Sequence, residues 1–109
     1  MARHENEKGA VAVIEHMVLF KVKPETPPAA VDAMLEGLRG LKSSSPQIVE
    51  LTCGANFSAR SQGFTHGLFV RFRTRADLEA YAVDPAHQKV VVERIRPITE
   101  NILVVDYEA

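Results

Sequence analysis

The chain has 109 residues, 46% hydrophobic and 25% charged, which is the usual size and composition of one folded domain. Its 13 Lys and Arg against 14 Asp and Glu leave a net charge of −1, which gives no broad attraction to nucleic acid or to an anionic membrane. Residues 1–10 are too polar for a secretory signal, no apolar stretch could span a bilayer, and the single Cys53 cannot form an intrachain disulfide, so we expect a cytoplasmic domain.

The first predicted element is a strand with apolar residues on both faces. It runs over residues 11–23, at the end of an N-terminal tail (1–12) that we expect to be disordered, and it opens a domain over 13–109. One face carries Ile14, His16, Val18, Phe20 and Val22, and the centre of the other carries Met17 and Leu19. Such a strand needs a cover on each face, and the chain's own helices can supply one of them.

A helix and two strands are predicted next. The helix begins with Thr26 as N-cap and Pro27 in the first helical position. Its apolar stripe consists of Val31, Met34, Leu35, Leu38 and Leu41. Residues 49–57 then alternate as a second strand, 58–63 form a hairpin loop, and 64–73 form a third strand.

The last third of the sequence predicts two helical pieces and a closing strand. Thr74 caps a short helix that reaches Tyr81, and Asp84 with Pro85 interrupts it and caps a second piece. The inward stripe of that second piece carries His87, Val91, Ile95 and Ile98, and residues 101–107 form a fourth strand. The order β-α-β-β-α-β predicts an α+β, ferredoxin-like fold, with a four-stranded antiparallel sheet and its helices on one face.

That architecture leaves one sheet face without a cover. Met17, Leu19 and Phe69 fall on this open face, and an apolar face of such size is typical of a partner site. For a small chain, self-association is the simplest solution, so we expect a homodimer formed through the open face. The alternative is a solvated sheet on a monomer.

Three histidines carry the main functional signal. His16, His66 and His87 are all predicted on the helix side of the sheet, where they can converge on one cavity. The alternative is that each is a buried core residue with its hydrogen bonds satisfied. A zinc site with three histidines lacks short ligand spacing and an obvious supporting carboxylate, so we predict no metal and no cofactor.

A nucleic-acid partner is not expected. Residues 69–72 (Phe-Val-Arg-Phe) match the back half of the third-strand signature of RNA-recognition modules. Residues 65–68 (Thr-His-Gly-Leu) stand where that signature requires a basic residue, glycine and an aromatic. The first strand also lacks a stacking aromatic on the open face.

Tyr81 and His87 form a second candidate pair. They lie six residues apart, which would place them on different faces of an unbroken helix, but the break at Asp84 and Pro85 can bring them to one pocket. The helix start disfavours a protonated His87, whereas Asp84 favours it. A neutral imidazole that accepts a proton at pH 7 is one outcome, and a structural hydrogen bond is the other.

Four segments resemble the stress-responsive A/B barrel domain family. They are 14–21 (IEHMVLFK), 63–67 (GFTHG), 81–87 (YAVDPAH) and 102–107 (ILVVDY), and they occur in the expected order between Val13 and Tyr107. The resemblance implies a dimeric α/β barrel, in which two sheets pack face to face with the helices outside. Plant members are linked with stress, and most have no assigned reaction.

The resemblance also implies roles for individual residues. A plant polyketide cyclase of the family performs an aldol ring closure with a Tyr–His pair that matches Tyr81 and His87. By that analogy His87 removes a proton next to a carbonyl and Tyr81 holds the enolate oxygen. The ligand-binding residues of the pocket would be His16, Val18, Phe20, His66 and Leu68. Asp84 departs from the pattern, because the cyclase and many relatives have a second histidine there.

Some relatives hold a magnesium ion on backbone carbonyls just after the first helix. The matching segment here is Lys42 to Ile48, and carbonyl ligands leave no side-chain signature in a sequence. The presence of this ion therefore stays open.

Three functions follow. The first is a stress-response A/B barrel protein, without an established reaction, that binds a small hydrophobic ligand between sheet and helices. The second is a polyketide-cyclase-like enzyme that transfers protons with His87 and Tyr81, and the third is a non-catalytic, self-assembling stability protein. The first two need an apolar pocket of roughly 300 Å³ beside Tyr81 and His87, whereas the third needs that space filled by side chains such as Phe20 and Leu68.

Overall fold

A computed structural model describes residues 12–109 of the chain. The predicted disordered tail and the start of the first predicted strand fall on residues 1–11, which lie outside the described residues. Ala12 is buried, and Val13 exchanges two backbone hydrogen bonds with Ala109, at 3.0 and 2.9 Å. The two ends of the described fold therefore pair with each other.

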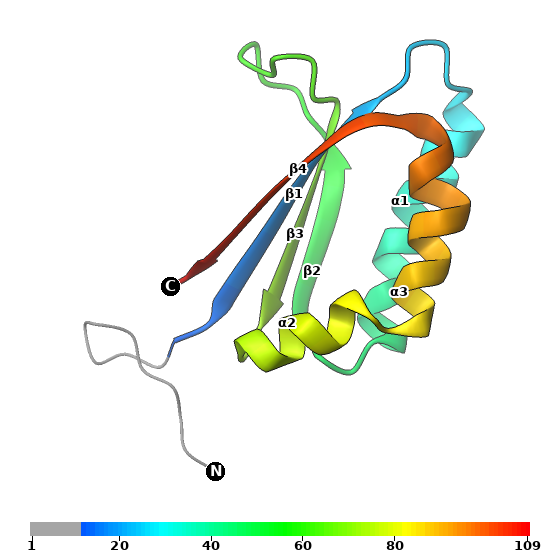
Figure 1. The fold of residues 1–109 in the computed structure, drawn as a ribbon. Helices are drawn as coiled ribbons and strands as arrows, with labels where there is room; N and C mark the ends of the chain where they lie inside the picture. Colours follow the sequence, from blue (N-terminus) through cyan, green and yellow to red (C-terminus); the bar gives the residue numbers. More distant parts are fainter. Residues whose placement is uncertain (1–11) are drawn as a thin grey trace.

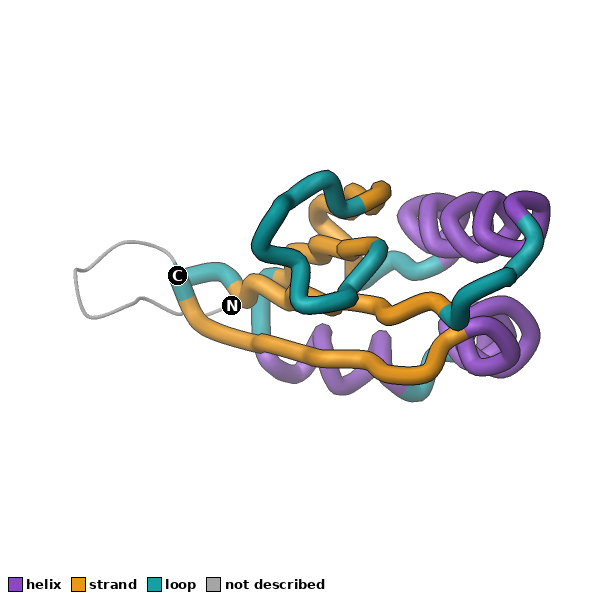
Figure 2. Tube along the Cα trace, turned by 90° about the horizontal axis from the view of Figure 1, so that it is seen from above, coloured by secondary structure: helices purple, strands orange, loops and turns teal. Residues whose placement is uncertain are grey.

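The chain folds into the predicted α+β architecture (Figure 1). Its elements are β1 (Ile14–Val22), α1 (Pro28–Ser44), β2 (Ile48–Ala55), β3 (His66–Phe72), α2 (Arg75–Ala82), α3 (Pro85–Val90), a π-helical turn η1 (Val91–Ile95), a 3₁₀ turn η2 (Arg96–Ile98) and β4 (Thr99–Glu108). The strands are ordered β2-β3-β1-β4, and all neighbours are antiparallel. This is the ferredoxin-like arrangement, and the helices and the sheet form two layers (Figure 2).

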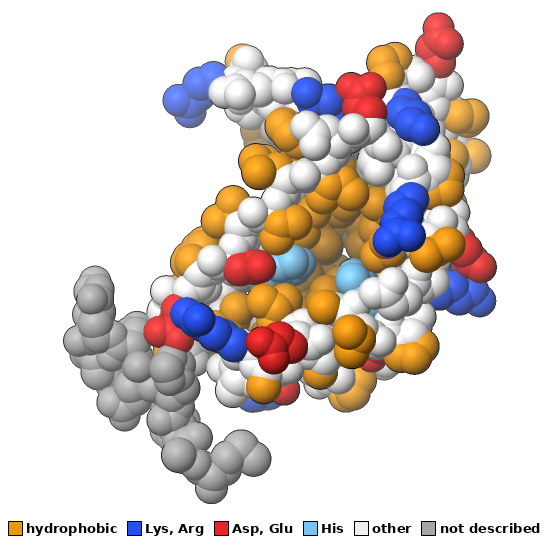
Figure 3. All heavy atoms as spheres, viewed as in Figure 1, with side chains coloured by type: hydrophobic (Ala, Val, Ile, Leu, Met, Phe, Trp, Pro, Cys, Tyr) orange, Lys and Arg blue, Asp and Glu red, His pale blue; other side chains and the backbone are white. Residues whose placement is uncertain are grey.

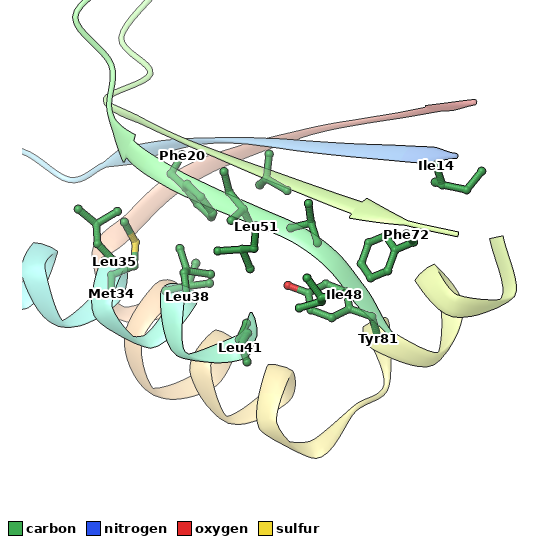
Figure 4. Packing of buried hydrophobic residues seen from close by; sticks show 14 of the residues in the cluster. Ile14, Phe20, Met34, Leu35, Leu38, Leu41, Ile48, Leu51, Phe72 and Tyr81 are labelled. Atoms are coloured by element: carbon green, nitrogen blue, oxygen red, sulfur yellow. The ribbon is translucent and has the colours of Figure 1, made fainter. Parts of the chain in front are cut away.

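The core lies between the sheet and the helices. The predicted stripe of α1 is buried at Met34, Leu35, Leu38 and Leu41, and Val31 is half-buried at its edge. These side chains meet the helix-facing side of the sheet, and Tyr81 of α2 lies beside Phe72 of β3 (Figure 4). No helix within residues 12–109 combines the length and apolar character needed to cross a membrane.

The start of α1 differs from the prediction. Thr26 does not cap the helix, since its hydroxyl donates to the Lys23 carbonyl (2.6 Å). Pro27 occupies the N-cap position with ψ 139°. The cause is Pro28, because a proline disfavours the helical conformation in the residue before it.

The second strand is shorter than predicted and slips in register. Phe57 is fully exposed beyond the end of β2, so the predicted alternation to that residue is wrong. An irregularity between Ile48 and Glu50 lets both Ile48 and Leu51 face the core. Periodicity alone cannot detect such a slip.

The caps of the later helices are confirmed. The Thr74 hydroxyl accepts from the Asp77 amide (3.1 Å) at the start of α2, and the Asp84 carboxylate accepts from the Ala86 amide (2.8 Å) at the start of α3. The second helical piece does not continue regularly to Ile98, because it changes to a π turn at Val91 and to a 3₁₀ turn next to Pro97.

The sheet face opposite the helices is open and largely apolar. Met17, Leu103, Val105 and Tyr107 are each 39–49% exposed on it. At one end of this face Glu15 is buried and pairs with Arg71 (Nε to Oε1, 2.8 Å). The predicted uncovered apolar face is therefore present in the single chain.

Candidate functional site

A cavity of about 180 Å³ lies between the sheet and the helical layer. Its apolar wall consists of Val18, Phe20, Leu38, Leu68, Val91, Ile95, Ile102 and Val104. Its polar end consists of His16, Tyr81 and His87. Figure 3 shows this region as a hollow with hydrophobic side chains on its floor and two histidines within it.

Strand register explains how residues far apart in sequence meet here. His16, Val18 and Phe20 share the inner face of β1 because side chains alternate along a strand. Leu68 of β3 pairs with Val18 on one side, and Val104 of β4 pairs with Val18 on the other. Val91 and Ile95 lie four residues apart on the π turn η1, and both line the same wall of the cavity.

Tyr81 has an unusual polar atom. Its side chain is only 1% exposed, and its hydroxyl is buried without a hydrogen-bond partner. Burial raises the pKa of Tyr81 above its ordinary value, and the nearby Asp84 carboxylate raises it further. The hydroxyl is therefore a protonated donor with no acceptor, and leaving such a group unpaired costs about 1–3 kcal/mol.

His87 lies against Tyr81, with ring centroids 4.1 Å apart. Its Nδ1 lies 3.4 Å from the Ala82 carbonyl oxygen. Because a carbonyl can only accept, this contact places the proton on Nδ1 and leaves Nε2 as the basic nitrogen. Burial lowers the pKa of His87, and nearby His16 also lowers it, against opposing effects of the Ala82 hydrogen bond and Asp84. The ring is thus a neutral base at pH 7.

His16 is held by a carboxylate that sequence reasoning missed. Its Nδ1 forms a hydrogen bond with Asp106 of β4, directly across the strand pair. The carboxylate can only accept, so Nδ1 of His16 carries the proton of this bond. Alternation could have found Asp106, since it shares a strand face with the cavity-lining Ile102 and Val104. The 90-residue separation from His16 hid the contact.

His66 is not brought to this cavity. It begins β3 opposite Phe20, and its Nδ1 bonds with the Thr65 hydroxyl (2.8 Å). Of the three histidines predicted to converge, the structure brings together His16 and His87 only. The remaining predicted pocket residues, Val18, Phe20 and Leu68, line the cavity beside Tyr81.

The stability of the fold should decline in mild acid. Burial lowers the pKa of both His87 and His66 below the ordinary value of 6.5, so the unfolded chain binds more protons just below that pH. These two groups should not affect the free energy of unfolding above about pH 6.5. Below that pH the free energy of unfolding should fall as the pH approaches the pKa values of the two histidines in the folded state. Urea unfolding between pH 7.5 and 5.5 measures this, and His87→Gln should make the decline shallower. An unchanged slope in that variant would contradict the assigned burial effect.

The cavity is smaller than the roughly 300 Å³ that the ligand-binding hypotheses require. Phe20 and Leu68 occupy part of the expected space, but they do not fill it. Since an apolar cavity of about 150 Å³ accommodates benzene, the space fits a molecule of about one ring.

The segment from Lys42 to Ile48 offers oxygen atoms to a hard cation. Ser45 is fully buried, and both its Oγ and the Oε1 of Gln47 are buried without a partner. Oxygen donors of this kind suit a hard cation such as magnesium, but the magnesium site that the resemblance implies uses backbone carbonyls, so these side-chain atoms do not test it. Elsewhere in residues 12–109, no three His, Cys, Asp or Glu side chains gather in a way that could hold a metal.

The model of the stress responsive A/B barrel domain matches residues 14–109, nearly the whole described chain. The chain belongs to this family. A stress-response A/B barrel domain-containing protein of Arabidopsis thaliana is 33% identical over 97 residues, which are 89% of this chain and 37% of that protein. The chain spans less than half the length of the curated relatives that it matches.

Solved structures share the A/B barrel domain fold. A hydroxynitrile lyase from Passiflora edulis matches with a TM-score of 0.81 and 23% identity, over 89% of this chain and 93% of that one. A dimeric ferredoxin-like protein of unknown function from Jannaschia sp. matches with a TM-score of 0.70 and 32% identity, over 89% and 99%. The first likeness concerns the fold alone, and the second is to a protein described as a dimer.

Proposed function

We propose that this A/B barrel domain binds a small, mostly apolar molecule of about one ring between its sheet and helices. The observation that carries the proposal is the Tyr81 hydroxyl, which is buried without a partner at the polar end of an apolar cavity. A fold retains such a costly donor where something else accepts its hydrogen bond. A ligand carbonyl or ether oxygen would do so, while the ring contacts Val18, Leu68 and Val104.

The proposal is tested with acetophenone and ethylbenzene. The two probes have similar size, but only acetophenone carries an acceptor for Tyr81. We expect acetophenone to bind about tenfold more tightly, the effect of roughly one hydrogen bond to a buried donor, in a titration followed by NMR.

A cavity-filling variant supplies the control. Val91 lines the cavity, whereas its neighbour Val92 is 52% exposed and outside it. Val91→Phe should abolish acetophenone binding, and Val92→Phe should leave it unchanged. Equal effects of the two variants would place the probe elsewhere and refute the proposed site.

The second candidate is an enzyme that moves a proton next to a carbonyl. Its support is that a neutral base, His87, lies against a protonated donor, Tyr81, with their ring centroids 4.1 Å apart. Nε2 of His87 would take the proton from the carbon, and the Tyr81 hydroxyl would hydrogen-bond the resulting enolate oxygen. A protein of the same fold is described as a hydroxynitrile lyase, so the architecture hosts an enzyme in that case.

Exchange of the acetophenone methyl protons in D₂O tests this step. If the chain is an enzyme of this class, it accelerates the exchange and His87→Gln removes most of the acceleration, while binding persists. Exchange at the buffer rate in the wild-type chain would leave the domain as a binding protein.

We further propose that the domain works as a homodimer formed through the open sheet face. Four half-exposed apolar residues, Met17, Leu103, Val105 and Tyr107, support this, together with relatives of the same fold that are described as dimeric. The third alternative, a self-assembling protein without a ligand, shares this interface and differs only in the cavity.

A further inference from the structure

The polar end of the cavity has acidic groups behind it. Among residues 12–109, the side chains that line the cavity include no Lys or Arg. Asp84 lies between Tyr81 and His87 in the chain, three residues from each, and its backbone amide donates to the Tyr81 carbonyl (3.1 Å). On the opposite side Asp106 accepts from His16.

The negative charges of Asp84 and Asp106 are only partly balanced by neighbouring groups. The Asp84 side chain bonds with the Ala86 amide, a neutral donor. Asp106 lines a surface groove whose described residues include Arg75 and Glu79. His87 is uncharged at pH 7 because its burial lowers its pKa. Asp84 therefore places a carboxylate behind the polar end that no Lys or Arg of the cavity lining offsets, and a ligand anion placed there would gain no such countercharge to replace its lost hydration.

We propose that the ligand is uncharged, a neutral carbonyl or hydroxyl compound, and that Asp84 makes the cavity reject carboxylates. This inference rests on the proposed ligand binding and specifies its chemical class. Tyr81 can donate to a neutral ketone as well as to a carboxylate, so the hydroxyl alone does not discriminate. Discrimination comes from the charge behind it, through repulsion that a neutral ligand does not experience.

Acetophenone and benzoate provide a matched pair of probes. They have the same ring and nearly the same shape, since one has a methyl where the other has a second oxygen with a negative charge. At pH 7.5 the wild-type chain should bind acetophenone about tenfold or more tightly than benzoate, a difference of about 1.4 kcal/mol. Asp84→Asn keeps the cap of α3, because Asn and Asp are equivalent N-caps, and should strengthen benzoate binding severalfold with little change for acetophenone.

Two further variants complete the experiment. Asp106→Asn should also favour benzoate, whereas Asp32→Asn, an exposed acid on α1 away from the cavity, should change neither affinity. Equal binding of the two probes by the wild-type chain would overturn the inference and leave the proposed binding intact. If discrimination persists in Asp84→Asn, the role of Asp84 is wrong. Failure of both probes to bind would refute the proposed function and this inference with it.

Discussion

Val105→Glu should convert the protein from a dimer to a monomer. Val105 lies near the middle of the open face, in register with Met17, and is 48% exposed in the single chain. In a two-fold interface the substitution buries two carboxylates without partners. Leaving a charge buried and unpaired costs about 3–5 kcal/mol, so the dissociation constant should rise at least about 100-fold.

Val92→Glu is the matched control for this experiment. Val92 is 52% exposed, on η1 in the helical layer rather than on the open face. Sedimentation equilibrium should find the control dimeric at concentrations where Val105→Glu is monomeric. A monomeric wild-type chain, or two variants that remain equally dimeric, would show that the open face is not the interface.

The fold was predictable because its signals are local. Alternation in residues 14–22 identifies the buried face of β1, and the stripe from Met34 to Leu41 identifies the face of α1. The side chains of Thr74 and Asp84 cap their helices by accepting from backbone amides two or three residues later in the chain. Each of these features depends on neighbours in the chain, which a sequence displays directly.

The misplaced details have causes that act against a local preference. Thr26 is a good N-cap residue, but Pro28 fixes the helix start one position later than the prediction. The slip near Val49 turns Ile48 toward the core in place of Val49, while Leu51 and Cys53 keep the predicted face, and only pairing with β3 specifies it. These are corrections of one or two residues within a correct topology.

The site was less predictable than the fold because it depends on long-range register. The pairing of Tyr81 with His87 can be predicted from one short segment, and their ring centroids lie 4.1 Å apart across the Asp84–Pro85 break. Asp106 reaches His16 only once β4 is aligned with β1, and His66 faces the correct layer but too far along the strand. A pattern gives the face of a residue and not its distance along the sheet.

Substitutions of Tyr81 should separate packing from ligand binding, and the two changes should have opposite effects on stability. Tyr81→Ala removes a fully buried ring whose centroid lies 5.1 Å from that of Phe72 and 4.1 Å from that of His87. This substitution should lower the free energy of unfolding by about 3–5 kcal/mol. Tyr81→Phe keeps the ring and removes only the unpartnered hydroxyl. Since that hydroxyl costs about 1–3 kcal/mol when buried and unpaired, this variant should be at least as stable as the wild-type chain.

The same Tyr81→Phe variant should bind acetophenone about tenfold more weakly, because the carbonyl loses its donor while the ring contacts remain. Urea unfolding at one fixed protein concentration measures the stability of a chain that dimerises, and the NMR titration measures the affinity. A polar atom that weakens the fold and strengthens binding is expected at a binding site, where function opposes stability. If Tyr81→Phe is instead destabilised and binds acetophenone as the wild-type chain does, the hydroxyl has a structural partner, and the main support for the proposed ligand site is lost.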